Sequence, residues 1–173
     1  ENIDTKKISP KYILSVIDSW KNKGWYPEEV VIKKKNILEK GFLNIYKIYQ
    51  SKLISLNTCD FSDLILHCVK IFEKNTDIAE LYSRNFKFIL VDEYQDTNLI
   101  QSKWLNYLAK YNKNICCVGD DDQSIYSWRG AEIKNFLEFD KIYLNTKIIR
   151  LEKNYRSTQN ILSVASKLIS NNQ

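Results

Sequence analysis

The fold is decided by one stretch of sequence, Phe86-Lys87-Phe88-Ile89-Leu90-Val91-Asp92-Glu93-Tyr94-Gln95-Asp96. A short apolar run opens this stretch, as is typical of a buried parallel strand, and two adjacent carboxylates, Asp92 and Glu93, follow it. Ligands of open α/β sheets bind beyond the carboxyl ends of such strands. One carboxylate can therefore hold Mg²⁺ beside a nucleotide, while the other positions or deprotonates an attacking water. In the alternative interpretation, both acids only favour the start of the next helix.

The composition predicts a globular, cytoplasmic protein with no membrane partner. The 173 residues are 44% hydrophobic and 27% charged, which suits one domain, or one domain with an appendage. No apolar run approaches the length of a membrane span. The net charge of +5 permits contact with nucleic acid without requiring it. Four cysteines without metal-ligand spacing are predicted to be buried free thiols in a reducing cytosol: Cys59, Cys68, Cys116 and Cys117.

The segment before residue 56 is predicted to be helical and to carry no chemistry. Ser9-Pro10 has the pattern of a helix cap followed by proline at the first helical position, and Pro27 is predicted to open a second helix. We expect a domain boundary near residue 55, which separates a helical segment, 1–55, from the domain that carries the strands, 56–173. The chain contains no methionine and begins at Glu1, so we expect it to be a fragment of a longer protein.

Strands and helices alternate after residue 56, which predicts an α/β fold with a parallel sheet. The strands are expected at 86–91, 115–118 and 148–151, and each one ends in a cluster of polar residues. In a parallel sheet all three clusters lie along the same edge, which is the layout of a phosphate-processing site. The three clusters are 92–96, 119–130 and 152–158.

The second cluster contains side chains suited to both phosphate and nucleic acid. A glutamine such as Gln123 can contact a terminal phosphate. Tyr126 and Trp128 flank a loop beside Arg129, and aromatic rings next to a cation suit stacking on single-stranded bases. The alternative for the two aromatic residues is packing in the core.

The third cluster offers Tyr155 and Arg156. An arginine there can neutralise charge in the transition state of phosphoryl transfer. The alternative is a helix-capping turn with a surface arginine.

Three of these stretches resemble motifs of superfamily 1 DNA helicases of the UvrD/Rep/PcrA type. Residues 91–98 resemble the Walker B motif of that family, residues 118–131 resemble its third motif, and residues 151–158 resemble its fourth. Residues 60–65 resemble a helix start upstream of the acidic motif, and the order and spacing of the motifs match as well.

The resemblance implies a fragment of the first RecA-like motor domain of a P-loop NTPase, preceded by the end of an accessory helical insertion. It implies an ATP-dependent 3′-5′ DNA helicase that uses ATP and Mg²⁺, in DNA repair or replication. Its implied partners are single-stranded DNA, junctions of single and double strands, and the remaining motor domains of the same chain. Two alternatives stay open: the motor subunit of a helicase-nuclease, and a non-catalytic nucleic-acid-binding module.

The resemblance also implies a role for each matching residue. Asp92 would bind Mg²⁺, Glu93 would activate the hydrolytic water, and Gln123 would contact the γ-phosphate. Arg156 would also reach the γ-phosphate and complete the catalytic group, and Tyr155 would stack on adenine. The residues implied to contact single-stranded DNA are Tyr126, Trp128 and Arg129.

The sequence departs from the family pattern at three residues and in one missing motif. Ser62 stands where the family often has an acidic residue. Asp121 stands where the family often has a small residue or proline, and Ser127 stands where it often has arginine. None of the four glycines begins a Gly-Lys-Ser/Thr sequence, so the phosphate-binding Walker A loop is absent. We therefore expect this chain alone to bind ATP weakly and not to hydrolyse it.

Overall fold

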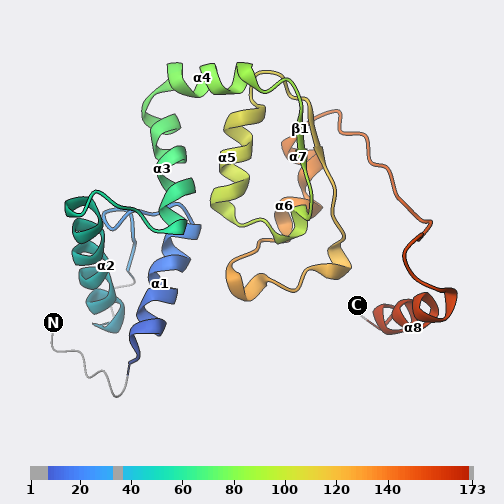
Figure 1. The fold of residues 1–173 in the computed structure, drawn as a ribbon, viewed down its shortest axis with the longest axis horizontal. Coiled ribbons are helices and arrows are strands. Elements are labelled where there is room, and N and C mark those ends of the chain that lie inside the picture. The colour runs from blue at the N-terminus through green and yellow to red at the C-terminus, as the bar shows by residue number, and fades with distance from the viewer. Residues whose placement is uncertain (1–7, 33–36, 172–173) are drawn as a thin grey trace. The chain divides into compact units, whose positions relative to one another are not determined.

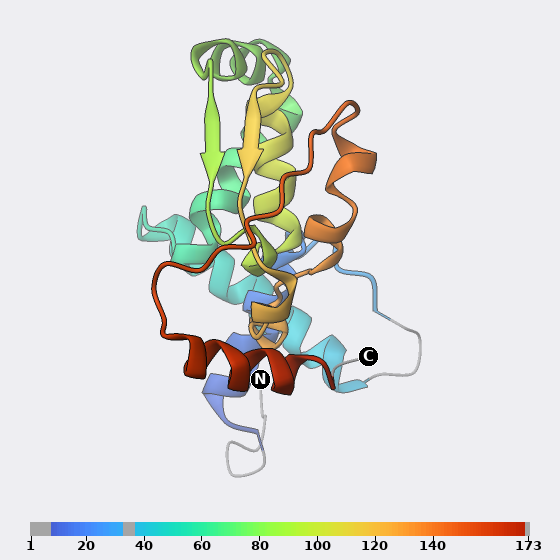
Figure 2. The same cartoon turned by 90° about the vertical axis from the view of Figure 1, so that its right-hand side faces the viewer.

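The computed structural model describes residues 8–32 and 37–171, and the chain forms two compact units, Glu1–Leu137 and Glu138–Gln173. The first unit combines helices with a small sheet (Figures 1 and 2). Its helices are α1 (Pro10–Asn22), α2 (Ile37–Ser55), α3 (Phe61–Lys74), α4 (Thr76–Asn85), α5 (Leu99–Ala109) and α6 (Lys134–Leu137). Its strands are β1 (Ile89–Val91) and β2 (Ile115–Cys117), and its 3-10 turns are η1 (Tyr94–Asp96), η2 (Asp121–Gln123) and η3 (Ser127–Arg129). The second unit contains α7 (Phe139–Ile142) and α8 (Gln159–Ile169).

The first predicted helix is confirmed, whereas the helix predicted to open at Pro27 does not form. The Ser9 side chain caps α1 at the expected place. Residues 27–29 form a turn instead, because the Glu29 carboxylate accepts a hydrogen bond from the Tyr26 N–H and pairs with Lys70 on α3. A tertiary ion pair therefore stabilises a turn where the local sequence indicates a helix.

Strands β1 and β2 pair in parallel, with Ile89 opposite Ile115 and Val91 opposite Cys117. The two strands lie side by side in Figure 2, and α5 connects them as a βαβ unit. Helices α3, α4 and α5 contribute a core cluster against which Ile89 packs. The predicted α/β fold with a parallel sheet is therefore confirmed.

The third predicted strand, 148–151, does not form. Within the described ranges, this segment of the second unit has no hydrogen-bonded partner strand. Its apolar side chains are exposed, with Ile148 at 71%, Ile149 at 68% and Leu151 at 84%. An apolar run predicts burial in a sheet, but a strand also needs a neighbour with which to form a ladder.

The cysteine prediction is only partly right. All four thiols are free, but Cys59, Cys68 and Cys116 are exposed rather than buried. Cys116 shares the uncovered face of the sheet with Leu90, which is 82% exposed. Cys117 alternates to the other face, and burial raises its pKa to about 12.

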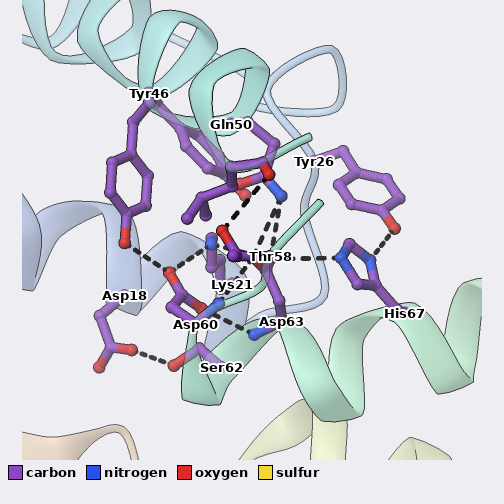
Figure 3. Close-up of polar contacts among 12 residues, drawn as sticks. Asp18, Lys21, Tyr26, Tyr46, Gln50, Thr58, Asp60, Ser62, Asp63 and His67 are labelled. Atoms are coloured by element: carbon purple, nitrogen blue, oxygen red, sulfur yellow. Dashed lines mark hydrogen bonds and ion pairs between the residues drawn. The ribbon is translucent and has the colours of Figure 1, made fainter. Parts of the chain in front are cut away.

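A buried ion cluster joins α1, α2 and the start of α3 (Figure 3). Lys21 is 1% exposed, and its Nζ lies 2.6 Å from Oδ2 of Asp60 and 2.8 Å from Oδ1 of Asp63. Asp63 is fully buried and also accepts a hydrogen bond of 3.1 Å from Nε2 of Gln50. Burial favours a raised pKa for Asp60, but hydrogen bonds from Lys21 and from the Asp63 N–H outweigh it and lower that pKa.

This cluster bears on the domain boundary expected near residue 55, which falls between α2 and α3. Lys21 comes before that boundary, and both of its carboxylate partners come after it. In this structure the segments on either side pack together within the first unit. A division into 1–55 and 56–173 stays a prediction.

Candidate functional site

The polar residues that follow β1 and β2 meet at the carboxyl end of the sheet. Backbone pairing continues beyond both strands, because the Val118 N–H donates to the Val91 carbonyl at 2.8 Å and the Tyr94 N–H donates to the Val118 carbonyl at 3.0 Å. The first two polar clusters are thereby held beside each other, as predicted for adjacent parallel strands.

The acidic pair lies at this end of the sheet with both carboxylates exposed. Glu93 has a left-handed backbone conformation, with φ of 50°, which is rare for a residue with a side chain and recurs at functional sites. Oδ1 of Asp92 accepts a hydrogen bond of 3.0 Å from the Glu93 N–H. Neither carboxylate pairs with a lysine or arginine in the described ranges.

The exposure of Asp92 fits its predicted role as a ligand of Mg²⁺. Asp92 is exposed and has no competing cation, so its carboxylate is available to Mg²⁺. The part of the chain that the structure describes holds no group of three or more metal-ligating side chains. Mg²⁺ beside a nucleotide usually takes only one or two protein carboxylates, together with phosphate oxygens and waters. The single exposed carboxylate of Asp92 is therefore a suitable protein ligand for Mg²⁺ beside a nucleotide.

A chain of hydrogen bonds connects Glu93 with Gln123. Nε2 of Gln95 donates to Oε2 of Glu93 at 2.7 Å, and Oε1 of Gln95 accepts from the Asp120 N–H at 3.1 Å. Oδ2 of Asp120 then accepts from Nε2 of Gln123 at 2.7 Å. The sequence prediction had placed Glu93 and Gln123 in one site but assigned no role to Gln95 or Asp120, although both lie in the predicted polar clusters.

The three residues predicted to contact DNA form one exposed group. The ring centroids of Tyr126 and Trp128 are 6.5 Å apart, and the Arg129 guanidinium carbon lies 5.5 Å and 5.3 Å from them. Trp128 is 77% exposed, so it does not pack in the core of this structure, and Tyr126 is 37% exposed. The group therefore offers aromatic surface and positive charge to a ligand.

The loop that carries this group is tied to the segment after β1. The Ala131 N–H donates to the Tyr126 carbonyl, and the Glu132 N–H donates to the Thr97 carbonyl at 2.9 Å. Gly130, which directly precedes Ala131, has φ of +90°, a conformation that glycine adopts without strain. The aromatic loop is thus anchored at Thr97, the residue that directly follows the acidic cluster 92–96.

The other two predicted residues, Tyr155 and Arg156, lie in the second unit. Asn154 Oδ1 accepts hydrogen bonds of 2.9 Å from the backbone N–H groups of Arg156 and Ser157 and so forms a turn before α8. Tyr155 is 85% exposed, and Arg156 is exposed as well. The exposed Arg156 agrees with the alternative of a surface arginine, but the turn lies before Thr158, the N-cap of α8, which forms no side-chain capping hydrogen bond. The nucleotide roles of Tyr155 and Arg156 stay predictions.

Comparison with known proteins decides the family. The family model of the UvrD/REP helicase N-terminal domain matches residues 1–143. This chain belongs to the UvrD/REP helicase family. The resemblance to this family is thereby confirmed. The matched range contains the first two motif stretches, 91–98 and 118–131, whereas 151–158 lies beyond it. The UvrD/REP N-terminal domain has the RecA-like α/β fold expected from the resemblance.

Relatives match the UvrD/REP chain over its whole length. A probable DNA helicase II homolog of Rickettsia conorii is 47% identical over 174 residues, which cover 100% of this chain and 27% of the relative. The ATP-dependent DNA helicase PcrA of Bacillus subtilis is 45% identical over 171 residues, or 99% of this chain and 23% of the relative. The chain therefore spans about a quarter of the length of these helicases.

In the described residues, no helix has the length and apolar character needed to cross a bilayer.

Proposed function

We propose that this chain carries the Walker B and DNA-contacting elements of an ATP-driven 3′-5′ DNA helicase. The observation that supports this most strongly is the hydrogen-bonded connection from Glu93 to Gln123, close in sequence to the exposed aromatic group. One loop, 119–131, thus holds a residue suited to a phosphate and residues suited to bases. That arrangement suits a motor in which ATP hydrolysis alters the grip on DNA.

The roles follow from the chemistry of each side chain. Mg²⁺ held by Asp92 and the nucleotide phosphates would neutralise phosphate charge. Glu93 would orient the attacking water and accept its proton, and the Gln123 amide would donate a hydrogen bond to the γ-phosphate. Arg156 would stabilise charge on the transferred phosphoryl group, and Tyr155 would stack on the adenine.

The DNA-contacting role rests on the exposed rings of Tyr126 and Trp128. Every base has a face on which an aromatic ring can stack, so such contacts tolerate any sequence. Arg129 adds a cation for the backbone phosphates or for stacking. This combination suits a protein that moves along a single strand rather than one that reads a specific site.

A strand-displacement assay with the complete gene product tests the proposal. With ATP and Mg²⁺, we expect a duplex with a 3′ single-stranded tail to be unwound and a duplex with a 5′ tail to be left intact. Degraded strands among the products would indicate the helicase-nuclease alternative. Binding of DNA without any ATP-dependent unwinding would contradict the proposal and favour the non-catalytic module.

Replacement of Trp128 by alanine should weaken DNA binding without abolishing basal ATP hydrolysis. Loss of one stacking face costs about 1–3 kcal/mol per base, which is roughly a 5- to 150-fold loss of affinity. Fluorescence anisotropy with a labelled single-stranded oligonucleotide at fixed salt measures this loss.

Tyr111→Ala is a matched control for Trp128→Ala. Tyr111 is also an exposed aromatic residue beside an arginine, with the Arg84 guanidinium carbon 3.7 Å from its ring centroid. It precedes β2 and therefore lies at the amino end of that strand, away from the polar clusters. Equal affinities of the two variants for DNA would remove Trp128 from the DNA site.

A further inference from the structure

We propose that Gln95 is a positioning residue that fixes the Glu93 carboxylate and links it to the turn that carries Gln123. The inference rests on the proposed function, because it concerns how the water-activating group is held. It starts from a contrast within the acidic motif: Glu93 is exposed, whereas Gln95, two residues later, is 1% exposed.

Both polar atoms of the buried Gln95 amide form hydrogen bonds. Its Nε2 donates to Oε2 of Glu93 at 2.7 Å, and its Oε1 accepts from the backbone N–H of Asp120 at 3.1 Å. An amide buried without hydrogen-bond partners costs free energy. Both polar atoms of the Gln95 amide are paired, so the two hydrogen bonds together fix the orientation of the side chain. The side chain therefore bridges the segment after β1 and the segment after β2.

The structure leaves room for this bridge by means of Gly119. A Cβ atom at residue 119 would lie 2.6 Å from Oε1 of Gln95 and 2.9 Å from the Phe136 ring. Any larger residue would therefore displace the amide or the α6 side chain beside it. The glycine is needed for close approach of the Gln95 amide.

The bridge has a direct consequence for the geometry of Glu93. An exposed glutamate side chain can adopt several rotamers, and only some of them suit an attacking water. The Gln95 amide engages one carboxylate oxygen and so restricts the side chain, while the second oxygen can accept the proton of the water. Because Asp120 also binds Gln123, movement of the Gln123 turn is transmitted to Glu93 through Gln95.

Gln95→Met in the complete protein tests the role of the amide. Methionine has a similar length but cannot form either hydrogen bond. We expect kcat for DNA-stimulated ATP hydrolysis to fall by about 10- to 100-fold, the scale of a misplaced reacting group, with KM for ATP changed by less than about 2-fold.

A double mutant separates positioning from a merely structural role. If Gln95 acts through Glu93, Gln95→Met should add little to the loss already caused by Glu93→Gln, as measured by single-turnover hydrolysis. If the double variant shows the product of the fold-losses of the two single variants, the inference is overturned. If Gln95→Met does not fold, Gly119→Ala replaces it, because the added Cβ would lie 2.6 Å from Oε1 of the same amide and should lower kcat in the same way.

Gln50→Met is the matched control. Gln50 is also buried, at 6% exposure, and its amide donates to a carboxylate, Asp63, in the helical ion cluster. The Gln50→Met substitution should lower the stability of the fold and leave kcat within about 2-fold of the wild-type value. An inactive Glu93→Gln together with unchanged kcat in Gln95→Met would refute the Gln95 inference alone. A fully active Glu93→Gln would refute the proposed function and the inference with it.

Discussion

Glu93→Gln in the complete protein is expected to lower DNA-stimulated ATP hydrolysis by about 10²-fold or more, the usual scale for loss of a general base. Glutamine keeps the size of the side chain and one carbonyl oxygen, but it cannot take a proton from water. Asp92 is unchanged in this variant, so affinity for ATP should change little. Steady-state hydrolysis at saturating single-stranded DNA and titration with a fluorescent ATP analogue measure the two quantities.

Glu80→Gln is a suitable control for this substitution. Glu80 is an exposed glutamate on α4 that pairs with Arg84, four residues later on the same helix. Such surface pairs contribute little, so hydrolysis should stay at the wild-type rate. If Glu93→Gln hydrolysed ATP as fast as Glu80→Gln, the acidic pair would serve only to begin the η1 turn.

Lys21→Met should destabilise the packing of α1 against α3 by about 3–5 kcal/mol, the typical cost of removing one partner from a buried ion pair. Methionine fills a similar volume, but it leaves the fully buried Asp63 carboxylate without its cation. Hydrogen exchange of the α1 and α3 amides in the complete protein measures this loss as reduced protection.

Lys23→Met is the control for the ion cluster. Lys23 caps the end of the same helix, but it is exposed, and its ammonium lies 5.2 Å from the Trp25 ring centroid. We expect a change of no more than about 1 kcal/mol there. Unchanged protection of α1 and α3 in Lys21→Met would show that the buried cluster contributes nothing to their packing.

Local sequence was sufficient to predict the two strands that form and the polar residues that follow them, although β1 begins at Ile89 rather than at Phe86. The strands β1 and β2 were found because each is a short apolar run followed at once by polar residues. The parallel arrangement followed from the helix between them. The position of Glu93 near Gln123 then followed from the rule that parallel strands end at the same edge.

Other features depend on contacts that no local pattern contains. Pro27 lies in a turn because Glu29 pairs with Lys70, which is 41 residues away in sequence. Lys21 would ordinarily be assigned to the surface, and only its two distant carboxylate partners explain its burial. Gln95 is similar, since its role became visible only when both partners of its amide were known.

The third predicted strand failed for a different reason. Residues 148–151 have the apolar character of a buried strand, but the described residues provide no neighbour for them. Composition can indicate that a segment prefers a sheet, but it cannot supply the adjacent strand. The position of Arg156 relative to Asp92 is accordingly a matter for experiment.

A structure of the complete protein with Mg²⁺ and a non-hydrolysable ATP analogue tests the central claim most directly. We expect Asp92, Gln123 and Arg156 to line one cleft at the carboxyl edge of the parallel sheet. The terminal phosphate should lie within hydrogen-bond distance of Gln123, with Glu93 facing the position of the attacking water. A nucleotide bound elsewhere, or any of Asp92, Gln123 and Arg156 on the opposite edge of the sheet, would contradict the account.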